Sequence, residues 1–583
     1  MILPGISTIE DNHLSMLKTK GRVSLLNEIE GIDSLKGHIG IAHTRWATHG
    51  KPSKENSHPH MDNSKNFSVV HNGIIENYIE LKTFLVSKGY NFLSQTDTEV
   101  IPNLIHYYYS QESSNNKFLH AVKRACDDLK GSFAIEVISI LHPDHVIVTR
   151  KDSPLVVGKG DNENFISSDI PAILSFTKNF YLLNDNEYAE IYNDKILFYD
   201  KDLNEISKEL KNINWDSSSA EKNGFEDYML KEIFEEPNAI RETIGTKLSI
   251  GKDIVLDELN FTKDYLKSIN KIYIVACGTA MHAGLATKTL IENLCNITVI
   301  VDIASEFRYR DPLVDEKTLA IFVSQSGETA DTIAALKLAK SKGAKTIAVS
   351  NVIGSSITRE ADYSIYTHAG PEIAVASTKA YTSQVTLLAI IGLYFSEILE
   401  HSNKDFINNI KKDILSLPDK VSNILDNVNC IKDFSKQVYT EHDMFYIGRG
   451  NDYAVAQEGS LKLKEISYIH SESYASGELK HGTIALIENG VTVVSIITDE
   501  TLAPKSLSNI QEVITRGAKT FIITNQNLDD KNFDFVFKID NISPYLSPIL
   551  SIVPMQLFAY YVAKEKRLDV DKPRNLAKSV TVE

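Results

Sequence analysis

The sequence predicts an α+β domain followed by two α/β domains with doubly wound parallel sheets. Three observations lead there. The chain of 583 residues is too long for one hydrophobic core. Residues 1 to about 205 contain short strand-like runs separated by turns, with few helices, which is typical of antiparallel sheets. From Lys271 onward strands alternate with helices, and this alternation is repeated later in the chain.

Composition indicates a globular protein of a reducing compartment. Hydrophobic residues make up 43% and charged residues 24% of the chain. The net charge of −16 argues against nucleic acid or an anionic membrane as a general partner. No apolar run reaches the roughly 18 residues of a membrane span, and no signal peptide is visible. The four cysteines lack paired spacing, so we expect a cytoplasmic protein; they are Cys126, Cys277, Cys295 and Cys430.

In the first domain, hydrophobic periodicity distinguishes strands from helices. Strands are expected at 38–47, 67–72, 132–140, 145–149 and 195–199. Helices are expected at 79–88, 99–109 and 118–129. After the first domain, a further helical pattern at 228–244, on either side of Pro237, leads into the next domain. The polar segment 202–223 contains three consecutive serines, and its later part is the expected linker. The resulting boundaries are 1–210, a linker at 211–240, 241–405, 430–573 and a C-terminal tail at 574–583.

The two later domains are predicted to be duplicates. Strands are expected at 271–276, 318–323 and 345–350. The strand-to-glycine step that ends at Gly278 recurs at Gly448, and the segment 342–347 recurs as 516–521 at a nearly equal offset. Segment 385–399 is apolar on most sides and is expected to be a buried helix.

One turn carries a candidate anion site. The apolar run 321–323 is followed by a hydroxyl-rich turn and then by helical spacing. A helix N-terminus offers free N–H groups and partial positive charge, which hydroxyl side chains can extend into a phosphate site. The alternative is an ordinary capping turn. The lysine of a nucleotide P-loop is missing, which favours a sugar phosphate over a nucleoside triphosphate.

Long sequence strings then point to a family. They are HTRWATHGKPS (43–53), HNGIIENY (71–78), TDTEVI (96–101), SQSGETADT (324–332), VASTKAY (375–381), EGSLKLKEISYIH (458–470), GELKHG (477–482) and DKPRNLAKSVTVE (571–583). Together they make nearly the whole chain resemble the glutamine–fructose-6-phosphate aminotransferase family. The resemblance implies a glutaminase domain of the N-terminal-nucleophile type, here truncated, followed by two sugar isomerase (SIS) domains.

The resemblance also implies a reaction and its partners. Glutamine is hydrolysed, and the ammonia replaces the C2 oxygen of fructose 6-phosphate. The product then isomerises to glucosamine 6-phosphate, the first step of hexosamine synthesis. The implied partners are fructose 6-phosphate and glutamine or ammonia, in a homodimer whose sites are completed across subunits. No cofactor, metal, nucleic acid or membrane is implied.

Four catalytic residues follow from the resemblance. Lys578 matches the lysine that forms a Schiff base with the open-chain sugar. Glu465 matches the base that moves a proton between C1 and C2, and Lys462 matches a further site position. His481 matches the residue that assists ring opening. Read without the resemblance, Lys578 is a solvated tail charge, Glu465 an ion-pair partner of Lys462 on a helix, and His481 a surface residue.

Further positions match binding residues of the family. The sugar-phosphate set is Thr279, Ser324, Gln325, Ser326, Thr329, Val375, Ser377 and Glu458. Ala280 departs from the pattern, because many relatives carry a hydroxyl residue there, and a sugar contact should be slightly weaker. In the glutaminase domain, Arg45 and Asp97 match the residues that bind the glutamine carboxylate and amine, Asn72 and Gly73 the oxyanion hole, and Trp46 the gate to the ammonia passage.

Five histidines between His43 and His71 invite a metal hypothesis, chiefly at His58 and His60. Alternate histidines without an acidic or cysteine companion at ligand-like spacing are a weak metal signal. The resembled family has no metal here, so none is expected.

The nucleophile of the glutaminase domain is missing. In the family the mature chain begins with cysteine, and its α-amine is the base, so only residue 1 can serve. This sequence begins with Met1, and its first cysteine, Cys126, falls in a helical pattern as a packing residue. Either the start is misplaced and the protein is an ordinary aminotransferase, or the chain works with free ammonia or as an ammonia-independent phosphosugar isomerase. A non-catalytic sugar-phosphate-binding regulator is the alternative from another class.

We expect the chain as printed to hydrolyse glutamine at a negligible rate, because an oxyanion hole without a nucleophile retains only residual catalysis. The check is a glutaminase assay beside an ammonia-dependent synthesis assay. Glutamine turnover equal to the ammonia-dependent rate would contradict the expectation, and mass spectrometry of the native N-terminus would identify a misplaced start.

Overall fold

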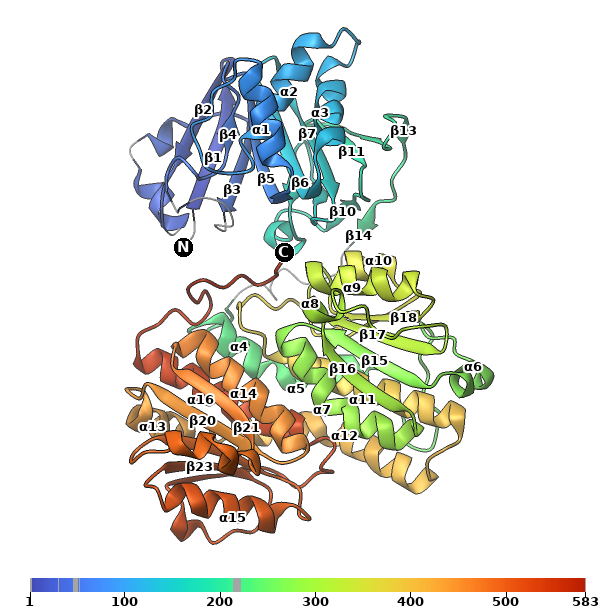
Figure 1. Ribbon diagram of the computed structural model, residues 1–583, viewed down its shortest axis with the longest axis vertical. Coiled ribbons are helices and arrows are strands. Elements are labelled where there is room, and N and C mark those ends of the chain that lie inside the picture. Colours follow the sequence, from blue (N-terminus) through green and yellow to red (C-terminus); the bar gives the residue numbers. More distant parts are fainter. Residues whose placement is uncertain are drawn as a thin grey trace. The chain divides into compact units, whose positions relative to one another are not determined.

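The computed structural model describes residues 3–21, 23–29, 31–45, 51, 53–212 and 222–581. The chain forms two compact units, each with its own core. The first holds residues 1–217 and 580–583, and the second holds residues 218–579. In Figure 1 the first unit runs from blue to teal and the second from green to red.

The first unit is rich in strands. Its strands are β1 (Leu3–Glu10), β2 (His13–Lys18), β3 (Ile39–Arg45), β4 (His60–Met61), β5 (Phe67–Ile75), β6 (Gly131–Ser139), β7 (His142–Lys151), β8 (Val156–Lys159), β9 (Asn164–Ser167), β10 (Asn179–Leu182), β11 (Tyr188–Ile191), β12 (Ile196–Tyr199), β13 (Glu205–Ile206) and β14 (Lys211–Asn212). Its helices are α1 (Tyr78–Ser87), α2 (Val100–Gln111) and α3 (Lys117–Asp128), with 3-10 turns η1 (Val23–Glu28), η2 (Ile32–Ser34) and η3 (Pro171–Ile173).

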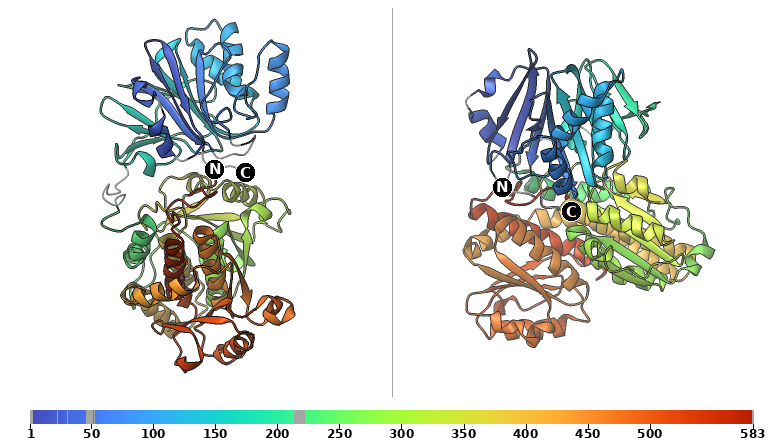
Figure 2. Two further views of the ribbon diagram at one scale, coloured as in Figure 1. Left: turned by 90° about the vertical axis from the view of Figure 1, so that its left-hand side faces the viewer. Right: turned by 45° about the horizontal axis from the view of Figure 1, so that its top comes forward.

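These strands form antiparallel sheets in layers, as the sequence predicted. The largest sheet has seven strands in the order β13-β12-β11-β7-β6-β5-β4. One of its faces packs against α1, α2 and α3, and Val69 and Ile135 lie in that core. On the other face, Val70 and Val148 pack with Ile41 of the second sheet, whose order is β2-β1-β3. In the left-hand view of Figure 2, the side of the first unit that carries β1 and β2 faces the viewer.

The sequence analysis missed the first hairpin, β1 and β2. Asp11 and Asn12 join these strands, and both have positive φ, at 47° and 60°. Asp and Asn tolerate this left-handed conformation, which two-residue hairpin turns require. The Asp-Asn pair between two apolar runs was therefore an available hairpin signal.

The second unit alternates strands and helices. Its strands are β15 (Lys271–Ala276), β16 (Thr298–Ile303), β17 (Thr318–Ser324), β18 (Lys345–Ser350), β19 (Tyr363–Tyr366), β20 (Asp443–Gly448), β21 (His470–Ala475), β22 (Thr492–Ile497), β23 (Lys519–Thr524) and β24 (Phe535–Lys538). Its helices are α4 (Tyr228–Phe234), α5 (Glu236–Ile244), α6 (Lys263–Ser268), α7 (Gly278–Cys295), α8 (Ala304–Phe307), α9 (Ala330–Ser341), α10 (Ser356–Glu360), α11 (Lys379–Leu399), α12 (Lys404–Leu425), α13 (Val428–Val438), α14 (Asn451–Ser467), α15 (Ala503–Ile514) and α16 (Ser547–Glu565), with 3-10 turns η5 (Glu478–His481), η6 (Thr483–Leu486) and η7 (Asp530–Asn532).

Two five-stranded parallel sheets confirm the predicted duplication. Their orders, β16-β15-β17-β18-β19 and β21-β20-β22-β23-β24, are the same when taken strand by strand. Helices cover both faces of each sheet. In β15, Ile272 and Ile274 join the core with α7 and α11, while Tyr273 and Val275 face α8 and α9. Strands buried on both faces explain the continuous apolar runs in the sequence.

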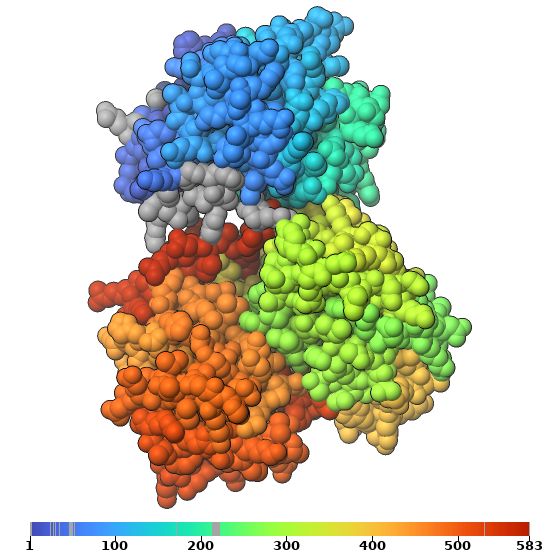
Figure 3. All heavy atoms as spheres, viewed as in Figure 1, coloured from blue at the N-terminus to red at the C-terminus, as the bar shows by residue number. Residues whose placement is uncertain are grey.

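One hydrophobic core joins the inner faces of the two sheets. It contains residues of α7, α11, α12, α13, α14 and α16 as well as both sheets. Helices α4 and α5 also contribute, through Met229, Ile233 and Ile240, and Pro237 lies in the first turn of α5, where proline is tolerated. Figure 3 shows the C-terminal segment, in red, at the surface of this unit above the orange lobe.

Helix α11 is the predicted buried helix. Among the described residues it is the one helix whose length and apolar composition would suffice to cross a membrane. However, 78% of its apolar stretch is buried inside the protein. Core helices can have the same length and composition. Its burial fixes the position of its first turn, where several site residues lie.

A glycine at the crossing of α14 and α16 provides a stability test. A Cβ on Gly459 would lie 2.3 Å from Met555 Sδ and 3.1 Å from Tyr446 Cε1. We expect Gly459→Ala to destabilise the second unit by about 1–3 kcal/mol, through overpacking. Thermal unfolding measures the change. Lys464→Ala, at an exposed position of the same helix, is the control and should stay within about 0.5 kcal/mol of the wild type.

Candidate active site

The hydroxyl-rich turn follows β17 and precedes α9. Ser324 is buried and ends the strand, and its Oγ lies 3.0 Å from Thr329 Oγ1. The N–H of Gly327 donates to Ser324 Oγ at 3.0 Å, and the N–H of Glu328 donates to Ser326 Oγ at 3.1 Å. Gln325 binds the next strand through its carbonyl, which accepts from the N–H of Asn351 at 3.1 Å. The turn therefore lies at the carboxyl edge of the sheet, and its hydroxyls bond to one another and to its own backbone N–H groups.

Gly327 permits the tight packing of this loop. Its φ is +68°, and a Cβ there would lie 2.0 Å from Ser355 Oγ. A side chain would therefore meet both backbone strain and a clash. The serines of the neighbouring strand and helix can approach the turn only because residue 327 is glycine.

Thr329 does not cap its own helix through its side chain. This residue is the N-cap of α9, yet its side chain makes no hydrogen bond to the first turn of the helix. Its hydroxyl faces Ser324 instead. The N–H groups at the start of α9 are left for another acceptor, as an anion site requires.

A second cluster joins α7 to α14. Glu458 is fully buried and accepts from Thr279 Oγ1 at 3.0 Å, while His282 Nδ1 lies 2.7 Å from its other oxygen. Lys462 Nζ, also fully buried, lies 3.3 Å from Glu458 Oε1 and 2.7 Å from Glu465 Oε2. Lys462 further donates to Thr279 at 3.0 Å. The predicted residues Thr279, Glu458, Lys462 and Glu465 therefore lie in one network.

Charge pairing dominates the pKa values in this cluster. Burial alone would raise the pKa of Glu458, but Lys462 and His282 hold it below its usual value. Burial alone would lower the pKa of Lys462, but Glu458 and Glu465 raise it. The buried lysine is therefore an ammonium at neutral pH, and it holds two carboxylates at fixed positions on one helix face.

The segment that carries Lys578 is anchored at several points. The carboxylate of Asp571 accepts from the N–H groups of Tyr228 and Met229, at 3.0 and 2.9 Å, and so caps α4. The carbonyl of Asp571 accepts from the N–H of Val375 at 3.0 Å. Farther along, Ser579 Oγ lies 3.0 Å from Ser326 Oγ. These contacts bring Lys578 beside the hydroxyl-rich turn, so it is not a solvated tail charge.

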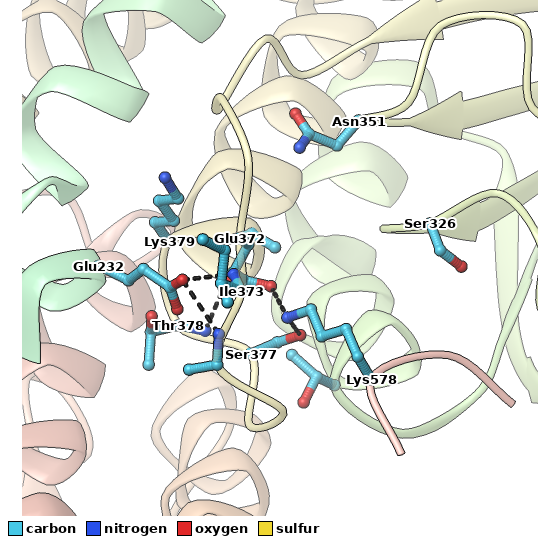
Figure 4. A network of polar contacts seen from close by, with 12 residues as sticks. Glu232, Ser326, Asn351, Glu372, Ile373, Ser377, Thr378, Lys379 and Lys578 are labelled. Atoms are coloured by element: carbon cyan, nitrogen blue, oxygen red, sulfur yellow. Dashed lines mark hydrogen bonds and ion pairs between the residues drawn. The ribbon is translucent and has the colours of Figure 1, made fainter. Parts of the chain in front are cut away.

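Lys578 itself contacts the loop that precedes α11. Its Nζ donates to Glu372 Oε2 and, at 3.4 Å, to Ser377 Oγ. Figure 4 shows Lys578 reaching from the C-terminal segment toward the loop that carries Glu372, Ile373 and Ser377. Of the predicted sugar-site residues, Val375 and Ser377 belong to this loop, and both are partly exposed.

Two buried glutamates bind backbone N–H groups of this loop, and their pKa values are shifted in opposite directions. Glu232, on α4, accepts from the N–H groups of Ile373 and Ala374. Burial and the nearby charge of Glu372 raise the pKa of Glu232 to about 8. For Glu372, burial alone would raise the pKa, but Lys578 and the N–H groups of the loop outweigh burial and lower it.

The structure does not bring His481 to these clusters. It lies at the end of η5 with an exposed side chain. Within the part of the chain that the structure describes, no hydrogen bond or ion pair joins it to Lys578, Glu465 or the hydroxyl-rich turn.

The predicted glutamine-binding residues lie together in the first unit. Arg45 ends β3 and is buried, and burial lowers its pKa while Asp97 opposes that shift. Asp97 is also buried and accepts from the N–H of Ile75 at 2.8 Å. Asn72 and Gly73 lie on β5, and Gly73 has φ +135° with Ser132 O 2.1 Å from a hypothetical Cβ. Trp46 lies outside the described residues.

The histidines of the first unit form a stacked cluster. The rings of His43 and His58 are 4.5 Å apart, and those of His58 and His60 are 5.1 Å apart. Thr98 Oγ1 lies 3.1 Å from His58 Nε2 and 3.0 Å from His71 Nδ1. Burial lowers the pKa of each of these histidines, that of His43 to about 3. Among the described residues no His, Cys, Asp and Glu group has a metal-binding arrangement.

Comparison with known proteins places this geometry in a family. A model of the SIS domain matches residues 265–393 and 437–565, and a model of a glutamine amidotransferase domain matches residues 43–175. The chain is 53% identical over 581 residues to the glutamine–fructose-6-phosphate aminotransferase [isomerizing] of Clostridium tetani, covering 99% of this chain and 95% of that protein. The enzyme of the same name from Clostridium perfringens is 52% identical over 583 residues, with the same coverage.

The chain belongs to the glutamine–fructose-6-phosphate aminotransferase (isomerizing) family. A solved structure agrees: the C-terminal domain of glucosamine-fructose-6-phosphate aminotransferase from Francisella tularensis is 38% identical, with a TM-score of 0.58. It covers 60% of this chain and 100% of that domain. The aminotransferase thus consists of a glutamine amidotransferase domain followed by two SIS domains, as the sequence predicted.

Sequence reasoning missed three residues of the aminotransferase networks: Glu232, His282 and Glu372. His282 follows Thr279 by three positions on α7, so helical spacing could have placed both on one face. Glu232 and Glu372 gave no such signal, because their partners lie far away in the sequence.

The raised pKa of Glu232 yields a pH-dependent prediction. Unfolded glutamate ionises near pH 4.3, whereas Glu232 in the folded protein keeps its proton up to about pH 8. The folded state therefore binds the extra proton between these values, and its stability falls as pH rises through that range. Glu232→Gln removes this loss, so it should be more stable than the wild type at pH 9, by about 1–3 kcal/mol.

Thermal unfolding at pH 5 and pH 9 measures this effect. The difference between variant and wild type should grow with pH. Glu316→Gln, at an exposed carboxylate, is the control and should show the same difference at both pH values. A Glu232→Gln difference independent of pH would contradict the assigned charge state.

Proposed function

We propose that this chain converts fructose 6-phosphate to glucosamine 6-phosphate, with glutamine or ammonia as the nitrogen donor. The observation that carries the proposal is the meeting of two elements in one unit. A hydroxyl-lined turn at a helix N-terminus suits a phosphate. Ser579, the residue after Lys578, contacts Ser326 of that turn, while Lys578 Nζ reaches Glu372 in the neighbouring loop.

The mechanism assigns each cluster a step. Ser324, Ser326 and Thr329 bind the phosphate with the N–H groups of the turn and hold the sugar in place. Lys578 supplies the amine that condenses with the C2 carbonyl. Glu465 is paired with Lys462 in the cluster that joins α7 to α14. It acts as the base that moves a proton between C1 and C2 of the sugar.

The glutamine-binding assignment rests on four residues of the first unit. Arg45 offers a buried cation for the glutamine carboxylate, and Asp97 offers a buried carboxylate for its amine. Asn72 and Gly73 supply the donors of an oxyanion hole on β5.

The assembly and location complete the proposal. We place the enzyme in the cytoplasm, which agrees with four cysteines that are all free among the described residues. We assign it a homodimer in which a second copy supplies His481, because that residue is exposed and apart from the clusters of its own chain. A non-catalytic sugar-phosphate regulator would have no use for the buried set of Glu458, Lys462 and Glu465.

Product formation from fructose 6-phosphate with ammonia and with glutamine, side by side, tests the proposal. We expect the wild type to form glucosamine 6-phosphate with ammonia, and Lys578→Ala to lose at least about 1000-fold of that activity, because the variant lacks the amine assigned to the Schiff base. Borohydride reduction should leave one hexose phosphate adduct on Lys578. Lys572→Ala, at an exposed lysine of the same segment, is the control. Activity retained in Lys578→Ala would overturn the proposal.

A further inference from the structure

The surroundings of Glu372 differ from those of an ordinary ion pair. Its side chain is buried, while that of Lys578 remains 22% exposed. One carboxylate oxygen, Oε1, accepts from the N–H groups of Thr378 and Ala380, at 2.9 and 3.0 Å. The other, Oε2, accepts from Lys578 Nζ. The two oxygens therefore have separate roles, one structural and one directed at the amine.

Helix α11 fixes the structural oxygen. Thr378 is its N-cap and Ala380 lies in its first turn, so Glu372 takes the place of a capping residue from outside the helix. The N-terminus of this buried helix of 21 residues carries partial positive charge, which stabilises the carboxylate as an anion. The acceptor is therefore both charged and held in one position.

We propose that Glu372 takes up and returns the protons of the Lys578 ammonium as this lysine condenses with the sugar carbonyl. This inference rests on the proposed function, because it concerns the same Schiff base. A lysine amine attacks a carbonyl only after losing a proton. Glu372 is the carboxylate in hydrogen-bond contact with that amine in the described structure, and an acid–base group must have this reach.

The protons balance in four steps. Glu372 removes one proton from the ammonium, and the freed nitrogen lone pair forms a bond to C2 while the carbonyl electron pair moves to O2. Glu372 returns the proton to O2, which gives the hydroxyl of a carbinolamine whose nitrogen still carries two hydrogens. The carboxylate then takes one of these hydrogens and delivers it to the hydroxyl. The nitrogen lone pair then forms the C2=N double bond while the C2–O2 bond breaks and its electron pair leaves with O2. O2 departs as water with two of the three original ammonium protons, and the third stays on the iminium nitrogen.

Other charged groups around the pair are arranged to leave Glu372 as the acceptor. Glu232 on α4 and Glu236 on α5 are buried acids whose pKa values are raised, so both hold their protons near neutral pH. Lys379 on α11 pairs with Glu235 at 2.8 Å. The ionised carboxylate beside Lys578 is that of Glu372, whose pKa is lowered.

The test measures how the rate of adduct formation depends on pH. Enzyme and fructose 6-phosphate are mixed, aged for different times and quenched with borohydride, and the adduct on Lys578 is counted by mass spectrometry from pH 6 to pH 8. In the wild type the transfer from Lys578 to Glu372 is internal, so the rate should change little with pH. In Glu372→Gln the amine must lose its proton to water, so the rate should be about 100-fold lower at pH 7 and rise about tenfold per pH unit.

Several variants make the test specific. Borohydride itself reacts at a rate that depends on pH. This dependence cancels when the adduct rate of each variant is divided by that of the wild type at the same pH. Glu372→Asp should restore part of the rate and the flat profile, and Glu232→Gln, which alters the other carboxylate of the loop, should keep the flat profile. Binding of a hexitol 6-phosphate, which has the phosphate but no carbonyl, shows that the site of each variant is folded.

The outcomes separate this inference from the proposed function. No adduct in the wild type would overturn the proposed function itself. An adduct in the wild type together with an unchanged rate in Glu372→Gln would overturn the role of Glu372 alone. A rate lowered by the same factor at every pH would also overturn it, because that result describes a residue that only positions Lys578.

Discussion

The contact between Glu372 and the first turn of α11 is the interaction on which the candidate active site depends. The helix is buried between the two sheets, so its N-terminus is fixed by the core. Its N–H groups hold one oxygen of Glu372, and the other oxygen holds Lys578. The position of the reactive amine is thereby tied to a buried helix of the unit, although the amine lies in a segment without regular structure.

Buried charge elsewhere in the unit follows the same logic. Glu458 and Lys462 are both fully buried, and each is paired and hydrogen-bonded, which is the condition under which buried ions are tolerated. For Glu232, burial and the charge of Glu372 outweigh the nearby Lys578 and Lys379 and raise its pKa to about 8. The chain as a whole carries a net charge of −16. Lys462 and Lys578 therefore supply positive charge locally in a protein whose overall charge is negative.

The two duplicated sheets have the same strand order, but the edge after β22 differs from the hydroxyl-rich turn after β17. Ser324 ends β17, and Thr498 follows β22 at the corresponding edge of the second sheet. There the carboxylate of Asp452 accepts from the N–H of Thr498 at 2.9 Å and from its hydroxyl. A side chain of the protein itself fills that edge. At the edge of the first sheet the hydroxyls of Ser324 and Thr329 bind one another, and Ser326 and Thr329 are partly exposed.

Local sequence determined much of the fold and one part of the site. Hydrophobic periodicity predicted the strands around Val69 and Ile274, the buried helix α11 and the turn from Ser324 to Thr329, because these features depend on neighbours in the chain. The family resemblance supplied Lys578 and Glu465. Tertiary structure alone brought Glu232 to the loop before α11 and Lys578 to Glu372 of that loop, since these partners lie far away from one another in the sequence. Burial raises the pKa of Glu232, whereas pairing with Lys578 lowers that of Glu372. Desolvation and charge pairing are properties of the packed chain, and no pattern of neighbouring residues encodes them.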